Sequence, residues 1–289
     1  MNRFLLCTDS GSDLSLDACR ELDIIPLKMK YSIDDKIYTD GMTVESVKEL
    51  YEKMREGAAP KTAQLNVSEF IDFWTPLLSE KKPILHISMG SGISGTYANA
   101  ELAKSMIIEK HPDAQIYIVD SLLASYAYGM LCIDISRMRA EGKTIEECYN
   151  WALERRHNVN TFYTTGDLKY LYRGGRVSRA GAIVGTVLNI NPILKLDKDG
   201  HLLVCDKSRG EKATERRVRE LIGSIVTDAK DQTLYISHSD AFEKAQKYGE
   251  AIKAEFGFRD ISYTYIGSTI GSHTGPGLVA FFFYGKPRT

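Results

Sequence analysis

The stretch that decides the fold is KPILHISMGSGISGTYANAELAKSMIIEK, residues 82–110. An apolar run at residues 84–87 is followed by a turn of small residues at 90–92. After the turn, apolar residues recur at three- and four-residue steps as far as Ile107. This order predicts a buried strand, a tight loop and a helix.

Ser94, Gly95 and Thr96 stand where this helix is predicted to begin. The first N–H groups of a helix have no partner within it, and the helix dipole makes that end partly positive. Gly95 lets a ligand approach the backbone closely, and the two hydroxyl groups can donate hydrogen bonds. These features fit a site for a carboxylate or a phosphate. An ordinary helix cap on a strand-to-helix turn explains the same residues, so both interpretations stay open at this point.

The composition of the 289 residues is that of an ordinary globular chain, long enough for two domains. Its net charge of −1 gives no overall field that would attract nucleic acid or an anionic membrane. The N-terminus resembles a first strand rather than a signal peptide, and no apolar run is long enough to span a membrane. Five scattered cysteines without CxxC spacing fit reduced thiols in a cytoplasm. We expect a cytoplasmic protein with no metal site and no cofactor.

Strands and helices alternate through the first half of the chain, which predicts an α/β domain with a parallel sheet. Ligands of such sheets bind beyond the carboxyl ends of the strands. We therefore expect three polar loops, at residues 8–13, 88–96 and 120–121, to meet at one edge. For the first loop, an equally good explanation is that Ser12 or Asp13 caps the following helix.

The second half mixes a predicted hairpin, at residues 193–205, with helices and further strands, and predicts an α+β domain with a mixed sheet. The glycine- and proline-containing residues 270–277 are expected to form a loop before the closing strand. The boundary is expected near residues 158–162. The predicted division is an N-terminal domain at 1–160 and a C-terminal domain at 161–289.

Two motifs of the second half carry candidate functional side chains. Arg173 and Arg176 flank Gly174-Gly175, where a sharp backbone turn would let both guanidinium groups project. His273 lies between glycines and a proline and is a candidate ligand contact or general base. A solvated turn and a loop histidine without a catalytic role explain the two motifs equally well.

Taken together, the motifs resemble those of the DegV family, bacterial fatty-acid-binding proteins that include the FakB-like acyl-carrier subunits of fatty acid kinase. The resemblance extends over nearly the whole chain, with the motifs in the same order. They are TDSGSDL (8–14), KTAQ (61–64), SGISGTYANA (91–100), VDS (119–121), LKYLYRGGRVS (168–178), LNINPIL (188–194), DGHL (199–202) and IGSHTGPG (270–277). Ala63 and Leu65 depart from the commonest pattern, in which serine and proline often stand.

The resemblance implies a DegV-like fold of two domains with one long-chain fatty acid buried between them. Thr62 and Ser94 would bind its carboxylate with help from the backbone N–H of Gly95, and His273 would belong to the same polar network. Arg173 and Arg209 would serve the encounter with a kinase. For the tail we expect an apolar tunnel lined by residues 122–130 and 180–188.

The function that this resemblance implies is that of a carrier, not of an enzyme. The fatty acid, such as palmitate, stearate or oleate, would be presented to a fatty acid kinase that makes the acyl phosphate. An acyltransferase would then take the product for phospholipid synthesis. Arg173, Arg176 and His273 could stabilise the added phosphate charge. We expect a monomer that touches membrane surfaces at most transiently and binds no nucleic acid.

One alternative belongs to a different class of function. The chain could be an enzyme acting on a small anionic substrate, with His273 as general base and Asp9 or Asp120 as its partner. A regulatory or DNA-binding role is disfavoured because no basic helix or recognition motif stands out.

Overall fold

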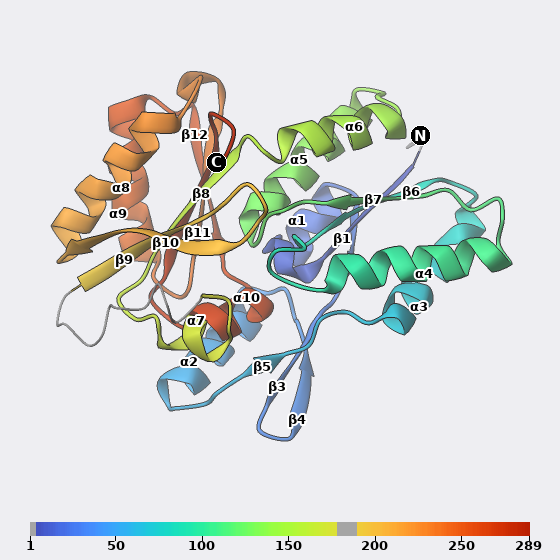
Figure 1. Ribbon diagram of the computed structural model, residues 1–289, viewed down its shortest axis with the longest axis horizontal. Helices are drawn as coiled ribbons and strands as arrows, with labels where there is room; N and C mark the ends of the chain where they lie inside the picture. The colour runs from blue at the N-terminus through green and yellow to red at the C-terminus, as the bar shows by residue number, and fades with distance from the viewer. Residues whose placement is uncertain (1–3, 178–189) are drawn as a thin grey trace.

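A computed structural model describes residues 4–177 and 190–289 of the chain (Figure 1). The strands are β1 Leu5–Asp9, β2 Ile24–Leu27, β3 Lys30–Ile33, β4 Lys36–Thr39, β5 Lys61–Thr62, β6 Ile84–Ser88, β7 Ile116–Asp120, β8 Val159–Thr164, β9 Ile190–Leu196, β10 Leu202–Arg209, β11 Thr233–His238, β12 Asp260–Tyr265 and β13 Val279–Tyr284. The α-helices are α1 Leu16–Glu21, α2 Val44–Arg55, α3 Val67–Leu77, α4 Thr96–Lys110, α5 Tyr126–Ala140, α6 Ile145–Arg155, α7 Lys169–Arg173, α8 Glu211–Ile225, α9 Phe242–Phe256 and α10 Ser268–Thr274. Short 3-10 turns include η1 Ser10–Ser12, η2 Leu78–Glu80 and η4 Ala229–Asp231.

The strands form sheets of two kinds, as the sequence predicts. The first-half sheet has the order β2-β1-β6-β7 and is parallel throughout. The second-half sheet has the order β10-β9-β8-β13-β11-β12 and is mixed, since only β11 and β12 pair in parallel. A small antiparallel sheet, β4-β3-β5, projects from the first half (Figure 1). The predicted α/β class with a parallel and a mixed sheet is confirmed.

Helix α5 joins the two large sheets. It contacts β1 and β6 of the parallel sheet as well as β8, β11 and β13 of the mixed sheet, and most of its residues are buried. Helices α8 and α9 cover the outer side of the mixed sheet (Figure 1). The largest apolar cluster therefore runs without a break from Phe4 in the first half to Phe282 in the second. In the described part of the chain, no helix has both the length and the apolar character needed to cross a membrane.

The mixed sheet begins with β8 at Val159, so the predicted boundary at residue 160 falls inside a strand. The continuous apolar cluster across α5 also ties the halves together. The division of the chain at this place stays a prediction, and the strand order favours a boundary just before Val159.

Several element predictions differ from the structure in detail. Residues 30–39 form a hairpin of β3 and β4, with Asp34 in a left-handed conformation (φ of 51°) at its turn. Helix α1, which follows the first polar loop, is capped by Ser15 and not by Ser12 or Asp13. The Ser15 hydroxyl oxygen accepts a hydrogen bond from Ala18 N–H at 3.1 Å. Part of the expected loop at residues 270–277 is helix α10, which is stabilised by packing on α2 and α7.

His86 on β6 gives the fold a predictable pH dependence. Its ring is fully buried among Phe70, Phe73 and Trp74, and within the described residues neither ring nitrogen has a hydrogen-bond partner. Burial lowers the pKa of His86 to about 3 from 6.5. Below about pH 6.5 His86 is therefore protonated in the unfolded chain but stays neutral in the folded chain. The free energy of unfolding consequently falls as the pH drops from 6.5 towards 3.

Replacing His86 by leucine, of similar volume, is expected to flatten this dependence. The slope of the unfolding free energy between pH 6 and pH 4 should fall by up to about 1.4 kcal/mol per pH unit, the value for one proton. Urea denaturation at a series of pH values measures it, with the exposed His111→Leu as the matched control. A His86→Leu variant that keeps the parent slope contradicts the assignment.

Candidate functional site

Two aspartates fix the loops at the carboxyl ends of the parallel strands. Asp9, the last residue of β1, accepts hydrogen bonds from Met89 N–H at 3.0 Å and from the Tyr128 hydroxyl at 2.6 Å. Asp120, the last residue of β7, accepts from the backbone N–H and the hydroxyl of Ser91, at 2.9 and 2.6 Å. The predicted convergence of the three loops is confirmed, and both carboxylates act on the loop that leads to Ser94.

Ser94 and Gly95 lie at the start of helix α4, as predicted. The Ser94 hydroxyl oxygen accepts from Thr96 N–H at 3.2 Å and lies 2.9 Å from the Thr96 hydroxyl. Gly95 is the N-cap residue and has no side chain to cap the helix itself. A Cβ atom at Gly95 would lie 2.3 Å from Oε1 of Gln64, so the KTAQ segment packs directly over this glycine. Ser94 therefore helps to cap the helix, and the segment carrying Thr62 lies beside it.

Thr62 and His273 form a hydrogen bond across 211 residues of sequence. Thr62 ends the short strand β5, His273 lies in the last turn of α10, and Thr62 Oγ1 is 2.6 Å from His273 Nε2. Both side chains are partly exposed. The structure thus brings together two residues that only the family resemblance had linked.

The charge state of His273 follows from its surroundings. Burial, and then the positive charges of Arg176 and Arg173, lower its pKa to about 4. The imidazole is therefore neutral at pH 7, with one N–H to donate. Such a weak base is poorly matched to general base catalysis near neutral pH. Since Asp9 and Asp120 hydrogen-bond elsewhere, the geometry does not favour the alternative of an enzyme with a His273–carboxylate pair.

The double glycine of the RGGR segment packs against the same histidine. A Cβ atom at Gly174 would lie 2.1 Å from Nδ1 of His273, so only glycine fits here with the histidine in place. Gly175 has a φ of 70°, a left-handed conformation that favours glycine. The Arg176 guanidinium turns back and donates to the carbonyl of Gly174 at 2.5 Å. The sharp turn predicted from the two glycines is confirmed.

An apolar cavity lies directly behind these polar groups. Its lining includes His273 and Arg176 together with Ile93, the neighbour of Ser94. The other described lining residues come from α7, α10, the mixed sheet and the segment before α5: Ala124, Tyr163, Leu171, Leu196, Leu202, Ile270, Thr274 and Leu278. The cavity measures about 50 Å³. Thr62, Ser94 and Gly95 are not among its described lining residues, but Thr62 hydrogen-bonds to His273 and Ser94 follows Ile93, and both of these neighbours line it.

The remaining predicted residues lie around this site or apart from it. Arg173 ends α7, is exposed and stacks over the Tyr170 ring at 5.2 Å. Arg209 is exposed at the end of β10 and does not line the cavity in the described part of the chain. Of the expected tail-lining residues 122–130, only Ala124 is among the described lining residues, and residues 180–188 lie outside the described residues.

Sequence reasoning missed most of the cavity wall. Leu196 and Leu202 belong to a predicted hairpin and Leu171 to the basic motif, but nothing in their local pattern distinguishes a cavity wall from an ordinary core. Gln64, which covers Gly95, belongs to the KTAQ motif, but the motif alone does not identify it as a site residue. Its position two residues after Thr62 was the available signal.

One group of side chains in the described residues has the spacing of metal ligands. Asp197, Asp199 and His201 lie together in the turn between β9 and β10. The Asp197 carboxylate already accepts from the N–H groups of Asp199 and His201, both at 2.9 Å, so it organises the turn. This exposed group is no part of the cavity.

Comparison with known proteins agrees with this architecture. The DegV family model, described as one of uncharacterised proteins, matches residues 3–286. A DegV domain-containing protein of Clostridium perfringens is 35% identical over 289 residues, covering 100% of this chain and 99% of the relative. A crystal structure described as fatty acid binding of a DegV family protein from Thermus thermophilus has a TM-score of 0.88 at 27% identity, covering 98% and 99% of the two chains.

A third relative shares the fold at lower identity. The fatty acid kinase (Fak) B3 protein of Streptococcus pneumoniae, solved with linoleic acid, has a TM-score of 0.83 at 19% identity and covers 96% of this chain and 98% of its own. The match of the family model over nearly the whole chain, with the full-length relative, shows that this protein belongs to the DegV family.

Proposed function

We propose that this protein binds one long-chain fatty acid, with the carboxylate at Thr62, Ser94, Gly95 and His273 and the tail in the apolar cavity. The observation that carries the proposal is the hydrogen bond between Thr62 and His273, because His273 lines that cavity. A neutral imidazole can donate its one N–H to the Thr62 hydroxyl oxygen, and the hydroxyl hydrogen is then left to donate to the carboxylate without any fixed charge. The binding of fatty acid by the Thermus thermophilus relative supports the same assignment.

The carboxylate needs such donors because its tail draws it out of water. Each buried methylene contributes ~0.8 kcal/mol, so the about 14–16 methylenes of palmitate or stearate favour burial strongly. A buried carboxylate without partners would offset much of that gain. The hydroxyl groups of Thr62 and Ser94 and the N–H groups at the start of α4 are the partners we assign.

The cavity must widen to hold such a tail. Its volume of about 50 Å³ is well below the roughly 300–1,000 Å³ of pockets that bury ligands of drug size. The walls next to His273 come from α7 and α10, short helices of five and seven residues. We propose that the acyl chain enters by separating these walls from the β9–β10 hairpin.

We further propose that the bound carboxylate is presented to a kinase subunit. One carboxylate oxygen would attack the terminal phosphorus of ATP held by the partner, and the bond from that phosphorus to ADP would break. The acyl phosphate formed would stay in this protein until an acyltransferase takes it. Arg176, His273 and the exposed Arg173 lie where they could meet the added charge. We place Arg209 at the kinase encounter on resemblance alone, and expect a monomer acting in the cytoplasm.

Replacing Arg173 by alanine is expected to leave fatty acid binding unchanged and to slow acyl phosphate formation with the kinase at least about tenfold. The reason is that Arg173 is exposed beside the site and points a positive charge outward. Lys169→Ala is the matched control, since its ammonium also stacks on the Tyr170 ring, at 4.8 Å. Loss of lipid binding in Arg173→Ala would show that the assigned role is wrong.

The binding proposal itself is tested by three probes on delipidated protein, measured by calorimetry. Palmitate should bind with one-to-one stoichiometry. Hexadecan-1-ol, with the same tail and no charge, should bind at least about tenfold more weakly, because the anion gains charge-assisted hydrogen bonds. Acetate alone should show no measurable binding. Tight binding of acetate with turnover of a small anion would support the enzyme alternative instead, and equal binding of the alcohol would contradict the carboxylate site.

A further inference from the structure

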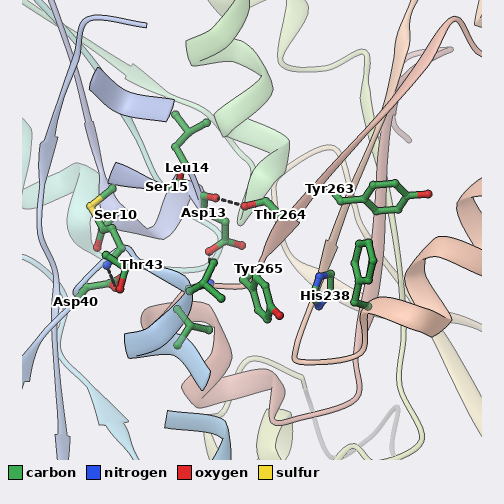
Figure 2. Close-up of a pocket in the computed structure, with 15 residues that line it drawn as sticks. Ser10, Asp13, Leu14, Ser15, Asp40, Thr43, His238, Tyr263, Thr264 and Tyr265 are labelled. Atoms are coloured by element: carbon green, nitrogen blue, oxygen red, sulfur yellow. Dashed lines mark hydrogen bonds between the residues drawn. The ribbon is translucent and has the colours of Figure 1, made fainter. Parts of the chain in front are cut away.

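A second pocket lies between the two halves of the chain, away from the apolar cavity. It measures about 290 Å³ and is lined by η1, the N-terminal part of α2, the end of β12 and the start of α9. Figure 2 shows Asp13 and Asp40 on one side, with the rings of Tyr265, His238 and Tyr263 on the other. None of these side chains serves the proposed carboxylate site.

The Asp13 carboxylate in this pocket already accepts hydrogen bonds from other groups of the protein on both of its oxygens. Its Oδ1 accepts from the N–H of Gly267 at 2.8 Å, and its Oδ2 accepts from the hydroxyl of Ser125. The hydroxyl of Thr264 donates to its backbone carbonyl at 2.9 Å. Asp13 thus joins the first half of the chain to the start of α10 and needs no ligand.

Asp40 differs, because one of its oxygens accepts no hydrogen bond of normal geometry from the described residues. Its side chain is 1% exposed, and Oδ1 accepts from Met42 N–H at 3.0 Å. Within the described residues, Oδ2 has no hydrogen-bond partner. The hydroxyl groups of Ser10 and Ser268 lie near enough to lower the pKa of Asp40, yet neither makes a hydrogen bond of normal geometry to Oδ2. Burial outweighs them and raises the pKa of this carboxyl.

The opposite wall and the mouth of the pocket are apolar and aromatic. The His238 imidazole contacts the rings of Phe242 and Tyr265, with its centroid 4.4 Å from that of Tyr265, and Phe242 in turn contacts the ring of Tyr263. Phe242 and Val44 are 45% and 41% exposed, which makes them two of the few large apolar side chains open to solvent in the described residues. A buried carboxylate in a pocket whose opposite wall is aromatic is suited to a cation that carries an apolar group.

We propose that this pocket binds a small organic ammonium compound, with the ammonium group on Asp40 Oδ2 and the apolar part against Phe242, Val44 and Tyr265. A divalent metal is a poorer fit, since Ca²⁺ takes six to eight oxygen ligands and Mg²⁺ an octahedral set. The facing rings cannot supply such ligands. This site does not depend on the fatty acid proposal.

The probe for this site is 2-phenylethylamine, compared with the neutral 2-phenylethanol. Binding is followed by NMR shifts of the Gly267 and Met42 amides, which lie beside the two carboxylates. The amine should bind at least about tenfold more tightly than the alcohol, as expected for a charge-assisted hydrogen bond. Equal affinities, or no saturable shift of these amides at millimolar amine, would overturn the proposal.

Three variants and a control sharpen the result. Asp40→Asn should weaken the amine at least about tenfold and leave the alcohol unchanged. Phe242→Ala, at the exposed mouth, should weaken both probes. Gly267→Ala would place a Cβ 3.1 Å from Asp13 Oδ1 and 3.6 Å from Asp40 Oδ2, and should block the amine while its φ of −67° suits alanine. Asp72→Asn, on the exposed surface of α3, is the matched control.

The three variants also protect the test against a failure to fold. Melting curves show which variants are folded, and Phe242→Ala changes only a half-exposed side chain. Palmitate binding, measured on the same samples, separates this site from the carboxylate site. Amine binding that survives both Asp40→Asn and Gly267→Ala would contradict the proposal whatever happens to palmitate.

Discussion

Replacing Thr62 and Ser94 together by alanine is expected to weaken palmitate binding at least about a hundredfold. Each hydroxyl is assigned one hydrogen bond to the carboxylate, and a hydrogen bond to a charged group contributes roughly 1.5–3 kcal/mol. His273 would also lose its Thr62 partner, which lies 2.6 Å away. Titration calorimetry on delipidated protein measures the change. Each single variant should show about tenfold or more.

Ser91→Ala is the matched control for this prediction. It removes a hydroxyl from the same loop, but one that donates to Asp120 at 2.6 Å and is not assigned to the carboxylate. Its palmitate affinity should stay within a few-fold of the parent. A double variant that binds palmitate as tightly as Ser91→Ala would show that the carboxylate lies elsewhere.

Replacing Asp9 by alanine is expected to lower the free energy of unfolding by about 3–5 kcal/mol. Asp9 is fully buried and accepts hydrogen bonds from the N–H groups of Gly11 and Met89 and from the Tyr128 hydroxyl. Leaving these buried donors unsatisfied costs roughly 1–3 kcal/mol each. Urea denaturation at pH 7 gives the value.

The control for Asp9 is Asp17→Ala, which removes an exposed carboxylate that pairs with Arg20 on the same helix. Surface ion pairs of this kind contribute little, so the change should be below about 1 kcal/mol. Equal effects of the two substitutions would contradict the role given to Asp9. Asp9→Asn should fall between them, since it keeps the shape and one acceptor oxygen.

Strand β6 and helix α4 could be predicted from the sequence because their signals are local. The apolar run of β6 and the three- and four-residue period of α4 stand on either side of small residues, and both elements lie where the pattern puts them. Tertiary packing has little to override in such segments.

Helix α10 could not be predicted, because its residues are poor helix formers. Serine, threonine and glycine dominate the segment and ordinarily favour turns. The helix forms because it packs on α2, α7, β3 and β5, and because the Ser272 hydroxyl donates to the carbonyl of Ser268 at 2.7 Å. Those partners come from distant parts of the chain, and no local pattern reports them.

The contacts of the site were beyond local patterns for the same reason. The Thr62–His273 bond joins a strand of two residues to a helix of seven, 211 positions apart. Asp13 looked like a helix cap, and instead ties the first half of the chain to Gly267. Only the order of motifs along the whole chain indicated that Thr62, Ser94 and His273 belong together.

The most direct measurement of the central claim is mass spectrometry of the lipid released by denaturing protein purified under native conditions. The account predicts one long-chain fatty acid per protein molecule, lost or strongly reduced in the Thr62→Ala, Ser94→Ala double variant. Wild-type protein that carries no fatty acid, and takes up none when palmitate is supplied, would contradict it.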